Sequence, residues 1–283
     1  GYSEISMHKI IFATDFSPVS RNILEYAARM AARTGADLVA AHALKPPSTI
    51  YDRGQEKSSA WQREHLARLE TFVDVPDLVE IDIGCRIAAG SPETALAKLV
   101  KEENADVLVL AKQSRSKLER FFVGSVTERI AAVSPFPVLV VPVAGSQTTN
   151  WKPILCVTDF SHHSRRALEW GIRLAEDHGA ELAVLNVLNT SSGGSGLPAA
   201  TRAIRQTERD LEELVSVLGA PKGTRTLVVQ GRPADTILEE ADRIGSDLVV
   251  IGRRGRAQGD YVGLGSTAHS VLKRETVPLA IIP

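Results

Sequence analysis

Short apolar runs recur along the chain and alternate with longer segments of helical periodicity. The runs at 10–13 and 38–44 are too continuous for a sheet with one solvated face, so they predict buried parallel strands. Between them, Ser17 can cap a helix, Pro18 fits its first position and Gly35 can end it. This alternation predicts a parallel sheet with helices on both faces.

The same pattern extends to the end of the chain. The expected strands are 10–13, 38–44, 79–83, 107–110 and 138–141 in the first half, then 154–157, one ending near Val187, 226–229, 248–251 and 279–282. Long polar helices are expected at 58–72 and 201–218, and further helices begin near Pro92, Pro233 and Gly265.

The chain also repeats itself. Residues 9–44 align with 153–188 without a gap, and 15 of these 36 positions are identical. The motif Thr-Asp-Phe-Ser occurs in both copies, at 14–17 and at 158–161. This self-similarity predicts a tandem duplication. The predicted domains are 7–144 and 151–283, joined by the polar segment 145–150.

Composition and charge exclude several classes of protein. The 283 residues carry a formal net charge of -1, which gives no overall attraction to nucleic acid or to an anionic membrane. The 43% of hydrophobic residues form no run long enough for a membrane span. The two cysteines show neither a disulfide framework nor metal-ligand spacing. We therefore expect a globular, cytoplasmic protein with no nucleic-acid and no membrane partner.

Glycines follow the fourth strand of the second copy. Gly252 and Gly255 are followed, nine residues later, by Gly265 and Ser266. Glycine permits positive φ and close approach of a ligand to the backbone, and a helix that starts at Gly265 would present free N–H groups to a phosphate. The alternative is a surface loop that needs glycines only for its turns.

A carboxylate is expected beside this loop. Asp159 ends the first strand of the second copy, and in a doubly wound sheet the first and fourth strand ends are neighbours. Arg253, Arg254 and Arg256 add local positive charge. Asp159 would repel phosphates, so it suits an exocyclic amine or a ribose hydroxyl. The alternative is that Asp159, like Asp15 in the first copy, only caps a turn or a helix.

These residues make the chain resemble a tandem universal stress protein. That family is marked by G-x2-G-x9-G-[S/T] and by an Asp after the first strand, both present in the second copy. The resemblance implies a five-stranded parallel sheet of order 3-2-1-4-5 in each domain, ATP with Mg²⁺ as ligand, and pairing of the fifth strands between the domains, with a homodimer as a further option. The implied binding residues are Thr158, Asp159, Val187, Ile251, Gly252, Arg254, Gly255, Gly265, Ser266 and Thr267.

The first copy departs from the family pattern. Ala111 and Ser114 stand where the second copy has the first two glycines, although Gly124 and Asp15 remain. If those positions need positive φ, a side chain costs about 1 to 2 kcal/mol, and each Cβ also intrudes on the phosphates. We expect the first copy to bind nucleotide weakly or not at all.

Together, these patterns predict a non-enzymatic, ATP-binding regulatory or stress-response protein with one competent site. No catalytic residue and no metal ligand of the protein is expected. One alternative is a slow ATPase on the same fold, although the GxxxxGK[ST] loop is missing. The other is a domain pair that binds an apolar ligand or only a protein partner.

Overall fold

The structure is a computed structural model that describes residues 7–45, 55–75, 78, 81–112, 124–145, 149, 151, 153–189, 197–256 and 263–283. These residues form two compact units. We call the described residues up to 149 the N-terminal unit and those from 151 to 283 the C-terminal unit.

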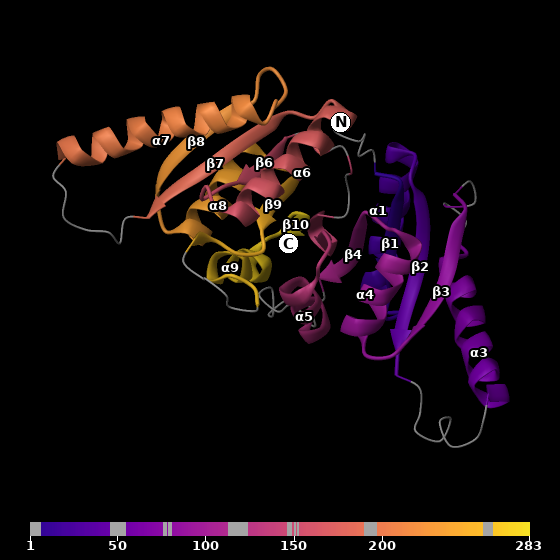
Figure 1. The fold of residues 1–283 in the computed structure, drawn as a ribbon. Helices are drawn as coiled ribbons and strands as arrows, with labels where there is room; N and C mark the ends of the chain where they lie inside the picture. Colours follow the sequence, from indigo (N-terminus) through magenta and orange to yellow (C-terminus); the bar gives the residue numbers. More distant parts are fainter. Residues whose placement is uncertain are drawn as a thin grey trace. The chain divides into compact units, whose positions relative to one another are not determined.

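The N-terminal unit is built on a parallel sheet with the strand order β3-β2-β1-β4-β5 (Figure 1). Its strands are β1 Lys9–Ala13, β2 Asp37–Leu44, β3 Ile83–Ala89, β4 Val107–Lys112 and β5 Val138–Pro142. Its helices are α1 Pro18–Thr34, α3 Gln55–Val73, α4 Pro92–Glu103 and α5 Ser125–Val133, with a short 3-10 turn, Val143–Gly145, after β5. Right-handed crossovers place α1 and α3 on one face of the sheet and α4 and α5 on the other.

The C-terminal unit repeats this architecture with the order β8-β7-β6-β9-β10, again all parallel. Its strands are β6 Ile154–Val157, β7 Leu182–Asn189, β8 Arg225–Gly231, β9 Leu248–Gly252 and β10 Leu279–Ile282. Its helices are α6 His162–His178, α7 Leu197–Val217, α8 Pro233–Ile244 and α9 Ser266–Arg274. Both units thus have the predicted doubly wound 3-2-1-4-5 topology.

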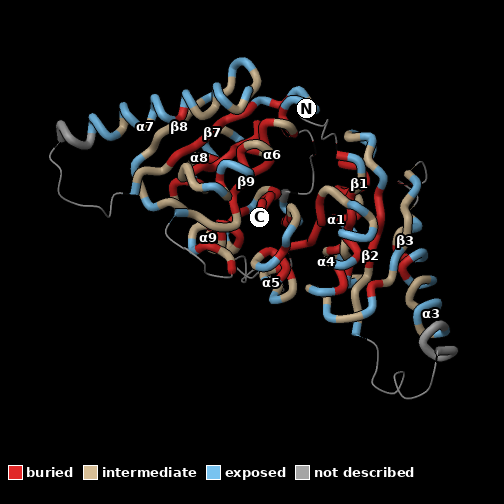
Figure 2. Tube along the Cα trace, viewed as in Figure 1, coloured by how far each residue is buried: buried red, intermediate tan, exposed pale blue. Residues whose placement is uncertain are grey.

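Local sequence signals set the helix ends as expected. The Ser17 hydroxyl accepts a hydrogen bond from the Ser20 N–H at 3.1 Å, and Ser161 caps α6 in the same way. Gly35 ends α1 with a φ of 68°, a left-handed conformation that favours glycine. Strands β4 and β9 are buried along their whole length (Figure 2). The continuous apolar runs therefore mark the centre of each sheet.

The third strand of the N-terminal unit was predicted wrongly. The structure places β3 at Ile83–Ala89, whereas 79–83 was expected. Leu78 and Ile81 belong to a turn in which the Ile81 N–H donates to the Leu78 carbonyl at 2.9 Å. An edge strand has only one neighbour and partial solvent contact, so its apolar pattern is weak.

The pairing of the fifth strands stays a prediction. None of the described helices combines the length and the apolar character required to span a membrane.

Candidate functional site

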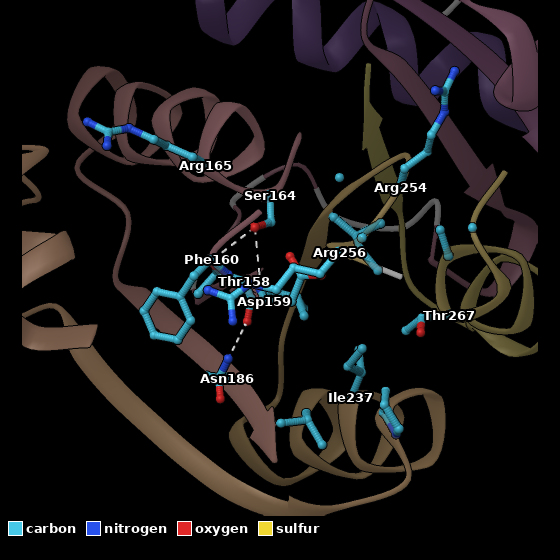
Figure 3. A pocket seen from close by; sticks show the side chains of 18 of the residues that line it. Thr158, Asp159, Phe160, Ser164, Arg165, Asn186, Ile237, Arg254, Arg256 and Thr267 are labelled. Atoms are coloured by element: carbon cyan, nitrogen blue, oxygen red, sulfur yellow. Dashed lines mark hydrogen bonds between the residues drawn. The ribbon is translucent and has the colours of Figure 1, made fainter. Parts of the chain in front are cut away.

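A pocket of about 1130 Å³ opens at the carboxyl ends of β6, β7 and β9 in the C-terminal unit (Figure 3). Its volume slightly exceeds the usual range for small-molecule sites. The structure brings all of the expected binding residues together in its lining: Thr158, Asp159, Val187, Ile251, Gly252, Arg254, Gly255, Gly265, Ser266 and Thr267.

The turn after β6 is tightly held. Phe160 has a φ of 62°, a left-handed conformation that costs a residue with a side chain about 1 to 2 kcal/mol. The turn is fixed because the Phe160 N–H donates to the Thr158 hydroxyl at 3.1 Å and the Ser161 N–H donates to Asp159 Oδ1 at 3.0 Å. Phe16 in the N-terminal unit has the same φ of 62°. Asp159 therefore does cap a turn.

Asp159 also reaches the glycine loop. Its Oδ2 accepts a hydrogen bond from the Arg256 N–H at 2.7 Å, which ties the loop after β9 to the end of β6. Burial raises the pKa of Asp159, but hydrogen bonds from Ser161, Arg256 and Ser164 outweigh it and hold the pKa below its ordinary value. The side chain is therefore a carboxylate at neutral pH.

We expect the Asp159→Asn variant to lose about 1 to 3 kcal/mol of unfolding free energy at pH 7, since an amide cannot accept both backbone hydrogen bonds equally well. Because the pKa is lowered by folding, the carboxylate's contribution is complete above the unfolded-state value, near 3.9. It is lost as the pH falls through the lower folded value. Denaturant unfolding should show that the difference in unfolding free energy between the variant and wild type is smaller at pH 3 than at pH 7. A difference that is the same at both pH values would contradict this assignment.

Gly252 and Gly255 allow other parts of the protein to approach their backbone closely. This corrects the expectation that they need positive φ, since neither glycine has a positive φ. A Cβ on Gly252 would lie 2.8 Å from the His163 carbonyl carbon and 2.9 Å from the Ser164 nitrogen. A Cβ on Gly255 would lie 2.5 Å from Asp159 Oδ2. The first glycine admits the start of α6, and the second admits the carboxylate.

The N–H groups at this end of the pocket divide into two sets. Those of Arg253 and Gly265 donate within the protein, to the Ile282 carbonyl at 2.7 Å and to the Arg253 carbonyl at 2.9 Å. Ser266, Thr267 and Ala268 form the first turn of α9, whose N–H groups have no acceptor within the helix. These three residues line the pocket. The anion-binding potential therefore lies at the α9 N-terminus more than in the loop itself.

Three arginines, Arg253, Arg254 and Arg256, line the pocket. Burial lowers the pKa of Arg253, and the nearby charges of Arg254 and Arg166 lower it further. The Arg254 guanidinium points away from Asp159 (Figure 3). The Arg256 guanidinium lies over the Phe160 ring, 5.5 Å from its centroid. The cluster is a region of positive potential that an anion would relieve.

The sequence reasoning missed several residues of the pocket wall. Asn186 of β7 donates from Nδ2 to the Thr158 carbonyl at 2.8 Å (Figure 3). The Ser164 hydroxyl lies 3.1 Å from that of Thr158 and accepts from the Asp159 N–H at 3.3 Å. The repeat contained a signal for both, because Ser164 matches Ser20 and Asn186 replaces His42. The part of the wall formed by α7 and α8 consists of Thr207, Asp210, Glu213, Leu214, Val217, Pro233 and Ile237.

In the N-terminal unit, aromatic rings gather around the matching turn. His42 Nδ1 lies 2.6 Å from the Thr14 carbonyl oxygen, and Asn186 Nδ2 makes the matching contact with the Thr158 carbonyl at 2.8 Å. The Phe16 ring lies 4.3 Å from the His42 ring and 5.5 Å from the Phe72 ring. The Arg68 guanidinium covers Phe16 at 4.3 Å. His42 is thus a packing residue that contacts the Phe16 ring beside the turn after β1.

No cluster of three or more His, Cys, Asp or Glu side chains suited to a metal ion occurs in the part of the chain that the structure describes. His162 and His163, which begin α6, have ring centroids 6.2 Å apart.

Comparison with known proteins shows that both halves of the chain match the same family. The sequence profile of the universal stress protein family matches residues 7–142 and 150–283. A universal stress protein of Thermus aquaticus is 31% identical over 136 residues, which are 47% of this chain and 98% of that protein. Universal stress protein YxiE of Bacillus subtilis is 29% identical over 143 residues, 46% of this chain and 97% of that protein.

Solved structures also extend over both units. The crystal structure of a universal stress protein from Archaeoglobus fulgidus covers 96% of this chain and 97% of its own, with a TM-score of 0.71 and 24% identity. At that identity the likeness shows the fold. Since the family profile matches both repeats across nearly the whole chain, the protein belongs to the universal stress protein family, with two such domains in tandem.

Proposed function

We propose that the C-terminal unit binds an adenine nucleotide, ATP with Mg²⁺, and that the protein is a nucleotide-dependent regulator with one competent site. The observation that carries this proposal is the polarity of the pocket. One end has the α9 N-terminus with Arg253 and Arg254, and the other has hydrogen-bond acceptors at Asp159 and Asn186. A triphosphate suits the first end and an amino-bearing base with its ribose suits the second.

The residues present fit such a ligand. Ser266 and Thr267 would hold phosphate oxygens with their hydroxyl and N–H groups, and Arg254 would add positive charge. Asp159 and the end of β7 near Val187 would hold the base and the ribose. Mg²⁺ would neutralise the phosphates and be held by them, since no cluster of ligating side chains is found among the described residues.

Binding without efficient turnover is the function that this site supports best. A general base needs a pKa near the working pH, whereas the pKa of Asp159 is lowered and both of its oxygens accept backbone hydrogen bonds. We propose that the nucleotide instead biases the loop after β9 and so alters the docking of a protein partner. Phosphate release well above the rate in buffer would contradict this part of the proposal.

Thermal unfolding in the presence of ATP and Mg²⁺ tests nucleotide binding. At a concentration 100 times its dissociation constant, a ligand adds about 2.7 kcal/mol to the unfolding free energy. We expect a clear rise in the melting temperature with ATP and Mg²⁺, and a smaller rise with adenosine, which lacks the phosphates. Unchanged melting at millimolar ATP would contradict the proposal and favour a non-nucleotide ligand or a protein partner.

A further inference from the structure

The base end of the pocket already holds a planar cation from the protein itself. The Arg256 side chain extends from the loop after β9 toward the turn that carries Asp159 and Phe160 (Figure 3). Its guanidinium lies over the Phe160 ring, 5.5 Å from the ring centroid, and both residues line the pocket. The cation thus lies at the turn that holds Asp159, where the proposed function places the base and the ribose.

Two fixed groups set this contact. The Arg256 N–H donates to Asp159 Oδ2 at 2.7 Å, so the backbone from which the side chain starts is tied to the turn. Phe160 is a left-handed residue with a φ of 62°, and its N–H donates to the Thr158 hydroxyl at 3.1 Å. Arg256 itself is exposed, and a cation–π contact at an exposed site is weak. The guanidinium can therefore leave the ring without breaking the hydrogen bond that holds its backbone.

The N-terminal unit makes the same contact from a different element. Phe16 has the matching place in its Thr-Asp-Phe-Ser turn, with the same φ of 62°. The Arg68 guanidinium lies 4.3 Å from the centre of the Phe16 ring, and Arg68 belongs to α3. In the C-terminal unit the cation comes from the loop after β9 instead. Because two unrelated segments supply it, the aromatic ring of this turn is a place that favours a planar cation.

A guanidinium resembles the amino-bearing edge of an adenine base. Both groups are planar, both carry an amino group beside a second nitrogen, both stack on aromatic rings and both donate hydrogen bonds to a carboxylate. An adenine base that stacks on Phe160 or donates to Asp159 therefore competes with the Arg256 guanidinium for the same surface of the pocket.

We propose that Arg256 is an internal competitor for the base end of the pocket. In the free protein its guanidinium covers Phe160, and a bound nucleoside displaces it. This inference rests on the proposed nucleotide function and adds the route by which binding reaches the loop after β9. The Arg256 N–H joins that loop to Asp159, so the residue whose side chain the nucleoside displaces is also the residue that holds the loop.

Adenosine isolates the base end because it has no phosphates. We expect calorimetric titration of the Arg256→Ala variant to show adenosine binding about two- to fivefold tighter than that of wild type, the fold-change that corresponds to an exposed cation–π contact. Arg232→Ala is the matched control and should bind adenosine like wild type, since Arg232 is an exposed arginine that does not line the pocket. Equal or weaker binding by Arg256→Ala would overturn the proposal, as would the same gain in the control.

Nuclear Overhauser contacts follow the guanidinium directly. We expect contacts between the Arg256 side-chain protons and the Phe160 ring protons in the free protein, and their loss at saturating adenosine. Contacts that persist at saturation, or that are missing from the free protein, would overturn this proposal while nucleotide binding stands. If wild type and Arg256→Ala bind neither adenosine nor ATP, the proposed function itself is contradicted, and this inference with it.

Discussion

We expect the Gly252→Ala variant to lose about 1 to 3 kcal/mol of unfolding free energy and its nucleotide affinity as well. The added methyl would lie 2.8 to 2.9 Å from three backbone atoms of His163 and Ser164. Backbone at the start of a helix cannot rotate away as a side chain can, so α6 or β9 must shift. Because the turn that holds Asp159 leads directly into α6, the shift moves the carboxylate relative to the glycine loop.

Chemical denaturation of wild type and variant measures this loss. Gly84→Ala is a matched control, because its Cβ would lie at an ordinary 3.5 Å from the nearest atom, in the Val39 side chain. We expect the control to stay within about 0.5 kcal/mol of wild type. Wild-type stability and wild-type ATP binding in Gly252→Ala would show that close approach of β9 and α6 is not the reason for this glycine.

Much of the fold was predictable because the sequence contains two similar copies that can be compared with each other. The two copies share Thr-Asp-Phe-Ser at 14–17 and 158–161, so a strand, a turn and a helix start could be placed twice. Continuous apolar runs marked the central strands, whose residues are buried on both faces. Only the edge strand β3 was misplaced, since partial solvent contact blurs its pattern.

The residues that line the site were predictable, whereas the physical reason for each residue was less so. The resemblance to the universal stress protein family, based on Asp159 and the glycine spacing, implied ten residues that do line one pocket. The reason for Gly252 and Gly255 could not be read from sequence, because an approach of 2.5 to 2.9 Å depends on how two elements pack. The α7 wall was missed for a similar reason. Asp210 and Glu213 look like ordinary solvated helix residues until β7 and α7 are placed side by side.

The second large effect concerns how many nucleotides each chain binds. The N-terminal unit has Ala111 and Ser114 in place of the two glycines that approach α6 and Asp159. Its Phe16 ring also lies 4.3 Å from the His42 ring, in a tilted arrangement, and contacts Phe72 edge-on. Residue 114 lies outside the described part of the chain, but a side chain at either position removes the close approach that Gly252 and Gly255 permit in the C-terminal unit. We therefore expect one site per chain, in the C-terminal unit.

Two variants assign that site to a unit. Gly255→Ala brings a Cβ within 2.5 Å of Asp159 Oδ2, which should displace the carboxylate from the Arg256 N–H and weaken ATP at least about tenfold. Gly124→Ala changes the glycine of the N-terminal unit that matches Gly265, and it should leave binding unchanged.

Calorimetric titration of the full-length chain with ATP and Mg²⁺ is the most direct test of these expectations. The account predicts a stoichiometry of one that is retained in Gly124→Ala and abolished or greatly weakened in Gly255→Ala. Two equivalent sites per chain, or a single site that survives Gly255→Ala and disappears in Gly124→Ala, would contradict it.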